Sequence, residues 1–166
     1  MREVPVQPLQ WESFHQYGEY SDVLNPVGYS LGDFYHDRLL FPVSAGRMVG
    51  FSTLLCSKQK ENIIESAECH NTAAEFLLPI DGDVIVHVAP PSQVPVPELT
   101  EAFLVPKGTM VMLRVGVWHL APFAVKEGDT HVLIGLPERI YKTDCMVITY
   151  AEDQKMKVNY TEDSKR

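Results

Sequence analysis

Three side chains that can bind a metal or transfer a proton lie in the sequence AECHNTAAE, within a stretch otherwise typical of a buried sheet. Glu68 and His70 are two residues apart, so on a strand they point to the same face. Glu75 opens the next apolar run, where a buried and unpaired carboxylate is unfavourable. Glu75 must therefore reach solvent, bind a metal ion, or pair with an arginine such as Arg47 or Arg114.

A fourth such side chain, His119, follows a predicted turn at Gly116 in the sequence RVGVWHLAPF. If the strands wrap into a barrel, His119 faces the first group across the interior. A lone histidine in a β protein more often has a structural role, and we expect this role for His15, His87 and His131. The two stretches together define a candidate site.

Short strands must position these residues. Segments rich in β-branched and aromatic residues recur between Gly, Pro, Asn and Asp: RMVGFSTLLC, EFLLPI, DVIVHVA, EAFLVP, TMVMLRV, WHLAPFAV, THVLIGL and CMVITYA. This density predicts a sandwich or a barrel. Helical signals are scarce, and Leu9, Trp11 and Phe14 predict one short helix that stops at Gly18. The predicted fold is all-β with a short N-terminal helix.

Turn signals divide these segments. Asp81 and Gly82 lie between two apolar runs and predict a tight hairpin that pairs LLPI with DVIVHV. The proline-rich sequence APPSQVPVPEL lacks ladder donors and predicts an exposed loop. We expect residues 1–150 to form a single domain, and the polar residues 151–166 to be a tail that frays or docks weakly on a partner subunit.

The composition limits the class of protein. Hydrophobic residues make up 45% of the chain and charged residues 22%, and no apolar run is long enough to span a membrane. The net charge of −8, without a basic patch, makes nucleic acid a poor partner. An odd number of cysteines without a CxxC pair predicts no disulfide framework. The sequence MREVPVQPLQW lacks the features of a secretory signal, so we expect a cytoplasmic protein.

The spacing of the two stretches resembles the two motifs of the cupins, G(x)5HxH(x)3,4E(x)6G and G(x)5PxG(x)2H(x)3N. His70, Glu75 and Gly82 match the second half of the first motif. Glu68 takes the place of the leading histidine of that motif, and Asn62 the place of its leading glycine. The first cupin motif is therefore matched in part.

The second cupin motif is matched by Gly108, Gly116 and His119. Arg114 stands at its proline position and Phe123 at its asparagine position. The resemblance implies a double-stranded β-helix, or jelly roll, with a divalent metal in its mouth.

In cupins the four matched positions are metal ligands, which implies a site made of Glu68, His70, Glu75 and His119. Two imidazoles and two carboxylates suit Ni, Mn, Fe or Zn, and leave room for substrate or water. Cupins of this size commonly pair through strands at one edge, which implies a homodimer.

The chain also resembles the ureidoglycolate lyases in the order and spacing of VQPLQWESFHQYGEYSDV, FYHDRLLFPV, ECHNTAAEFLLPIDGDVIVHVAPP, GVWHLAPFAV and TDCMVI. This resemblance implies an enzyme that cleaves ureidoglycolate, or a related small hydroxy acid, to glyoxylate and urea. Two features depart from the family: Glu75 stands where its members carry glutamine, and Leu54 and Leu55 stand where they carry an arginine. A non-catalytic cupin that binds a metabolite, and a metal-dependent isomerase or dioxygenase, are the alternatives.

His119 and Glu68 are the predicted catalytic residues. With a metal held by the other ligands, Glu68 is the best-placed proton shuttle if it is not a ligand itself. Without a metal, His119 or His70 has to act as the base directly.

Arg114, Trp118 and His36 are predicted to contact the substrate. The guanidinium of Arg114 suits a substrate carboxylate, or else an ion pair within the protein. Trp118 forms either an apolar wall beside the site or ordinary core. His36 lies in the segment FYHDR, which resembles the family.

Overall fold

The computed structural model describes residues 1–43 and 46–161. Strands dominate it, and they are β1 Arg2–Pro8, β2 Gly18–Asp22, β3 Val49–Ser57, β4 Ile63–Ile64, β5 Ser66–Cys69, β6 Glu75–Pro79, β7 Val84–Ala89, β8 Glu101–Val105, β9 Thr109–Leu113, β10 Trp118–His119, β11 Phe123–Ala124, β12 Asp129–Pro137, β13 Met146–Thr149 and β14 Met156–Asn159. The helices are α1 Trp11–Phe14, the 3-10 helix η1 Pro97–Leu99 and α2 Ile140–Thr143. In the described part of the chain, none of them has the length and hydropathy needed to cross a membrane.

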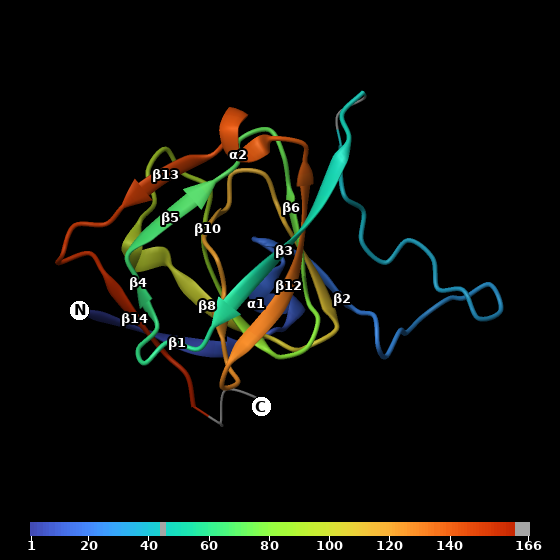
Figure 1. Cartoon of the computed structure of the whole chain (residues 1–166), viewed down its shortest axis with the longest axis horizontal. Coiled ribbons are helices and arrows are strands. Elements are labelled where there is room, and N and C mark those ends of the chain that lie inside the picture. The colour runs from blue at the N-terminus through green and yellow to red at the C-terminus, as the bar shows by residue number, and fades with distance from the viewer. Residues whose placement is uncertain (44–45, 162–166) are drawn as a thin grey trace.

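The strands form two curled sheets (Figure 1). The nine-stranded sheet has the order β13-β5-β10-β7-β8-β1-β14-β4, with β11 paired to β7. The five-stranded sheet has the order β2-β9-β6-β12-β3. This arrangement confirms the predicted all-β, cupin-like jelly roll.

The two sheets enclose the main core cluster. Phe103 of β8, Val111 of β9 and Val132 of β12 are buried in it. The short helix α1 adds Phe14, whose ring meets the ring of Phe103 edge-on at a centroid distance of 5.1 Å. The predicted N-terminal helix is therefore present, and Phe14 is the residue that it buries in the core.

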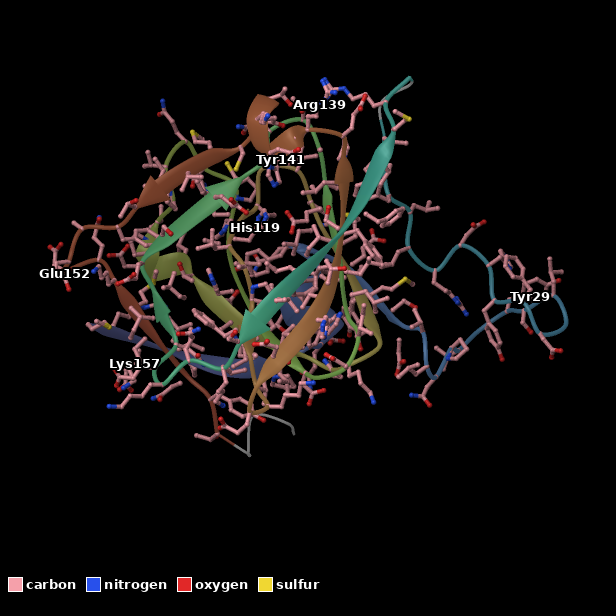
Figure 2. All side chains as sticks on the ribbon, viewed as in Figure 1. Tyr29, His119, Arg139, Tyr141, Glu152 and Lys157 are labelled. Atoms are coloured by element: carbon pink, nitrogen blue, oxygen red, sulfur yellow. The ribbon has the colours of Figure 1, made fainter. Side chains whose placement is uncertain are left out.

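A second core cluster lies on the other face of the larger sheet. Val86 of β7 belongs to the main cluster and its neighbour Ile85 to the second, because successive side chains of a strand point to opposite faces. Met156 and Val158 of β14 are buried in the second cluster, and β14 pairs in parallel with β1. β14, which carries Lys157 (Figure 2), thus pairs within the larger sheet, whereas the sequence predicts that residues 151–166 fray or dock weakly on a partner subunit.

The predicted hairpin at Asp81 and Gly82 is wrong. β6 pairs with β9 and β12, whereas β7 pairs with β8, β10 and β11, so the chain crosses between the sheets here. The carboxylate of Asp81 accepts a hydrogen bond from the backbone N–H of His131 and lies 2.7 Å from the Nδ1 atom of its ring. A Cβ atom at Gly82 would lie 2.9 Å from the side chains of Lys126 and Thr130. Asp81 and Gly82 therefore lie where the chain passes from one sheet to the other, and not in a tight hairpin turn.

The segment between β2 and β3 projects from the body of the protein (Figure 1). We call residues 23–43 and 46–48 the arm. Several apolar side chains of the arm are exposed: Val27, Tyr29, Leu31, Phe34, Leu40 and Met48.

Candidate metal centre

Strand pairing brings the two sequence stretches together. β10 pairs antiparallel with β5, which sets His119 opposite Glu68. The backbone N–H of Gly116 donates a 2.7 Å hydrogen bond to the carbonyl oxygen of His70. Gly116 has a φ angle of +79°, a left-handed conformation that favours glycine, so the turn before His119 depends on this residue.

Four side chains form the candidate metal centre: Glu68, His70, Glu75 and His119. Each offers one ligand atom, and these atoms lie within 4.8 Å of one another. The Oε2 atom of Glu75 lies 3.2 Å from Nε2 of His70 and 3.0 Å from Nε2 of His119. These three side chains are buried, whereas Glu68 is half-buried and accepts a 3.3 Å hydrogen bond from the thiol of Cys145.

Backbone carbonyls orient both imidazoles of the centre. The Nδ1 atom of His70 lies 2.6 Å from the carbonyl oxygen of Asp144, and that of His119 lies 2.9 Å from the carbonyl oxygen of Val117. Because a carbonyl oxygen only accepts, each Nδ1 atom carries a proton and each Nε2 atom is left to face the cluster. The same arrangement orients metal-binding histidines in general.

The buried side chains of His70, Glu75 and His119 shift one another's pKa values. Burial opposes the ionised form of Glu75, but the charge and hydrogen bonds of His119 and His70 outweigh it and lower the pKa of the carboxyl to about 2. Burial also opposes protonation of His119, but the carboxylate of Glu75 prevails and raises the pKa of the imidazole to about 9. Against the effect of burial, the hydrogen bond to Glu75 raises the pKa of His70 as well. The buried carboxylate therefore demands positive charge beside it.

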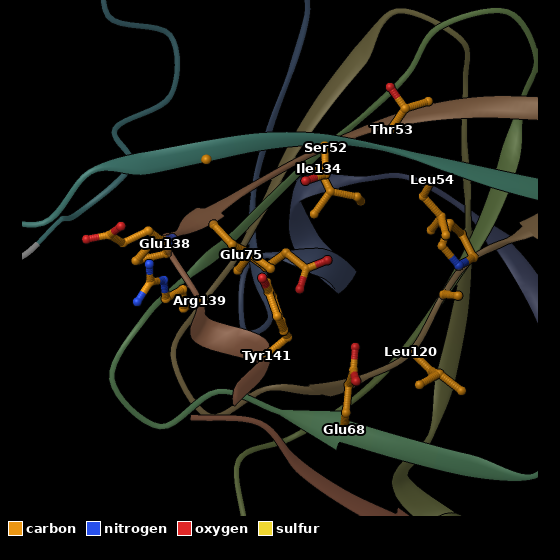
Figure 3. Close-up of a pocket in the computed structure, with 15 residues that line it drawn as sticks. Ser52, Thr53, Leu54, Glu68, Glu75, Leu120, Ile134, Glu138, Arg139 and Tyr141 are labelled. Carbon is orange, nitrogen blue, oxygen red and sulfur yellow. The ribbon is translucent and has the colours of Figure 1, made fainter. Parts of the chain in front are cut away.

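The donor set fits a divalent metal ion. Two Nε2 atoms and two carboxylates are ligands that Mn, Fe, Ni and Zn accept, and a metal can replace the imidazole protons that now compensate Glu75. The centre also borders a cavity of about 460 Å³, with Glu68 and Glu75 among its lining residues (Figure 3). The cavity leaves space for a small substrate, and Leu54, Leu120 and Ile134 give it apolar walls.

The rim of this cavity contains residues that the sequence motifs do not indicate. The residue before α2 and α2 itself supply Arg139 and Tyr141, and Glu138 lies beside them (Figure 3). Ile140 is the buried residue of this short helix, and four residues are too few to show a helical pattern. An isolated tyrosine in PERIYKT is the one signal that the sequence offers here.

Two predicted substrate-contacting residues lie away from the cavity. The guanidinium of Arg114 donates a hydrogen bond to the carbonyl oxygen of His15 and lies 3.7 Å from the carboxylate of Glu19. His36 lies in the arm, where its ring centroid is 5.4 Å from that of Tyr29. The structure brings neither residue to the candidate metal centre.

Trp118 is adjacent to His119 in sequence but lies on the opposite face of the sheet. It belongs to the second core cluster, is 1% exposed, and its indole N–H donates to the carbonyl and hydroxyl oxygens of Ser92. The indole therefore lies away from the cavity and within the core.

The fold and the site together define the class of protein: a cupin-type jelly roll with a candidate metal centre at its cavity. The model of the ureidoglycolate lyase family matches residues 1–159, so the chain belongs to this family.

Several solved structures also match the chain. An oxalate decarboxylase of Lactobacillus farciminis, solved as a formate complex, aligns with a TM-score of 0.43 and 13% identity over 70% of this chain and 35% of its own. This chain thus spans about a third of the length of that protein. No curated protein matches the sequence.

Proposed function

We propose that this protein cleaves ureidoglycolate to glyoxylate and urea at the candidate metal centre. One observation carries the proposal: ligand atoms of Glu68, His70, Glu75 and His119 gather within 4.8 Å of one another beside a cavity. Membership of the ureidoglycolate lyase family suggests the substrate. The donor set suggests metal-assisted acid–base chemistry.

His70, Glu75 and His119 would hold the metal. A bound divalent ion lowers the pKa of a hydroxyl group beside it and compensates the charge of a carboxylate. The carbonyl groups of Asp144 and Val117 keep both imidazoles turned toward that position. The Glu75 carboxylate lies within hydrogen-bond distance of the Nε2 atoms of both rings.

Glu68 is the proton shuttle in this proposal. Its carboxylate takes the proton of the substrate hydroxyl, the freed electron pair forms the carbonyl of glyoxylate, and the carbon–nitrogen bond breaks. The same proton then passes from Glu68 to the departing nitrogen, which leaves as urea. Atoms and charge balance without an oxidant or a second substrate. The half-buried position of Glu68 at the cavity fits this role.

Metal content and glyoxylate release test the proposal together. Protein purified without chelator should contain an equimolar divalent metal by elemental analysis, and should release glyoxylate from ureidoglycolate. Chelation should abolish the release, and one of Ni, Mn, Fe or Zn should restore it. Thermal stabilisation by ureidoglycolate without turnover would instead indicate a binding module, and a reaction that consumes dioxygen would indicate an oxygenase.

We further propose that the protein works in the cytoplasm as a homodimer. Cys56, Cys69 and Cys145 are free, which suits a reducing compartment. The arm exposes several apolar side chains, with Tyr29 69% and Phe34 63% exposed, and a gathering of such side chains suits an interaction surface. We take the partner to be a second copy of the same chain, because a second copy is present wherever the protein is made.

Light scattering after size-exclusion chromatography tests the assembly. Protein recovered from the cytosolic fraction should have twice the 18.7 kDa mass of the chain. A double substitution in the arm, Tyr29→Ser with Phe34→Ser, should halve that mass without lowering the melting temperature. Val94→Ser, at an exposed residue of the proline-rich loop, is the matched control and should leave the mass unchanged. A monomeric wild-type protein would contradict the proposal.

A further inference from the structure

We propose that the phenol of Tyr141 hydrogen-bonds the ureido oxygen of the substrate and stabilises the ureido group as it departs. The inference rests on the proposed function and identifies a residue that recognises the leaving group. It assigns the rim of the cavity to the ureido end of the molecule, and the metal centre to the hydroxy acid end.

The side chain of Tyr141 reaches from α2 into the cavity toward Glu75 (Figure 3). The residue is 67% exposed, and within the described ranges its hydroxyl has no hydrogen-bond partner. The guanidinium of the neighbouring Arg139 points away from the cavity in the same view. Of these two rim side chains, the phenol is therefore the donor presented to a bound molecule.

The backbone that carries Tyr141 is held by contacts on either side of it. Ile140, the preceding residue, is fully buried and anchors α2 in the core. Asp144, three residues further on, has its backbone N–H bonded to the carbonyl of Ile140 and its carboxylate bonded to the backbone N–H of Asn71. The carbonyl oxygen of Asp144 also accepts the Nδ1 proton of His70. One short segment thus orients a metal-centre imidazole and also carries Tyr141 at the rim of the cavity.

The chemistry of the cavity decides which part of the substrate meets the phenol. The carboxylate and hydroxyl of ureidoglycolate belong at the metal centre, so the third substituent, the ureido group, extends toward the rim. Glu68 and Glu75 only accept hydrogen bonds when ionised. The other hydroxyl donors of the lining, Ser52 and Thr53, belong to β3 and not to the rim at α2. The ureido oxygen needs a donor, and the phenol of Tyr141 supplies one.

The hydrogen bond gains strength during the reaction. As the carbon–nitrogen bond breaks, negative charge builds on the ureido group and is shared with its oxygen. A fixed donor placed at that oxygen stabilises the transition state more than the bound substrate. The phenol keeps its own proton, because the departing nitrogen receives its proton from Glu68.

Tyr141→Phe tests this role, since it removes the hydroxyl and keeps the ring. We expect kcat for glyoxylate release to fall about tenfold, with the metal content and the melting temperature unchanged. Binding is measured with two probes by calorimetry: N-carbamoylglycine, which has the ureido group, and glycolate, which lacks it. Tyr141→Phe should weaken binding of N-carbamoylglycine about fivefold or more and leave binding of glycolate unchanged. Tyr29→Phe, in the arm, is the matched control and should change neither.

The outcomes separate this inference from the proposed function. A wild-type enzyme that releases glyoxylate, with a Tyr141→Phe variant equal to it, overturns the inference alone. A wild-type protein without turnover, whose Tyr141→Phe variant still loses N-carbamoylglycine selectively, overturns the proposed reaction and supports recognition of the ureido group. Equal weakening of both probes, or no binding of either probe to the wild type, overturns the inference.

Discussion

Replacing His119 with glutamine should reduce glyoxylate release by about 10²-fold or more and remove most of the bound metal. The Nε2 atom of His119 is one of the two imidazole nitrogens of the candidate metal centre and lies 3.0 Å from Glu75. Glutamine keeps a polar group beside the buried carboxylate, so the loss reports on the ligand rather than on an unpaired charge. Elemental analysis and the glyoxylate assay on the same preparation measure both effects.

His131→Gln is the matched control for that experiment. His131 is exposed, lies on β12 and pairs with Asp81, away from the candidate metal centre. This variant should retain both the metal and the activity. If His119→Gln folds, as judged by circular dichroism, and keeps full activity, the metal centre is not the site of the reaction.

The candidate metal centre could be predicted from the sequence because its residues obey local rules. The two-residue spacing of Glu68 and His70 places both on one face, and the glycine turn at Gly116 precedes His119. These rules require no knowledge of which strands pair. The meeting of the two stretches in space depends on the pairing of β5 with β10. Local rules do not predict this pairing, and only the family resemblance implied it.

Alternation along a strand explains why Trp118 does not reach the cavity. The rule that places Glu68 and His70 together also sends adjacent residues of a strand to opposite faces. Trp118 therefore faces the second core cluster when His119 faces the centre. Proximity to His119 in sequence was a poor guide to contact for a residue on the same strand.

Contacts between distant elements set the remaining features. Arg114 follows β9, and its pairing with Glu19 depends on the antiparallel register of β9 with β2. Asp81 and Gly82 form a common hairpin signal, yet their function here is a contact with His131 and a close approach to neighbouring side chains. Tyr141 reaches the cavity because α2 docks on the loop after His70, and the local sequence carries no trace of that contact.

Trp118→Ala should lower the free energy of unfolding by about 3–5 kcal/mol, which is a large part of the stability of a domain of this size. The indole is 1% exposed and lies in the second core cluster, so alanine leaves a cavity that the paired strands around it cannot close. Urea unfolding followed by circular dichroism measures the change. A loss below about 1 kcal/mol would contradict the assignment of this residue to the core.

Trp118→Phe separates stability from substrate contact. Phenylalanine fills most of the space but cannot donate to the carbonyl and hydroxyl oxygens of Ser92, so we expect a loss of about 1–2 kcal/mol. The metal content and the KM for ureidoglycolate should stay at the wild-type values, because the indole and the imidazole of His119 lie on opposite faces of the sheet. A KM raised about tenfold in this folded variant would instead place the indole in contact with the substrate, as its sequence position first indicated.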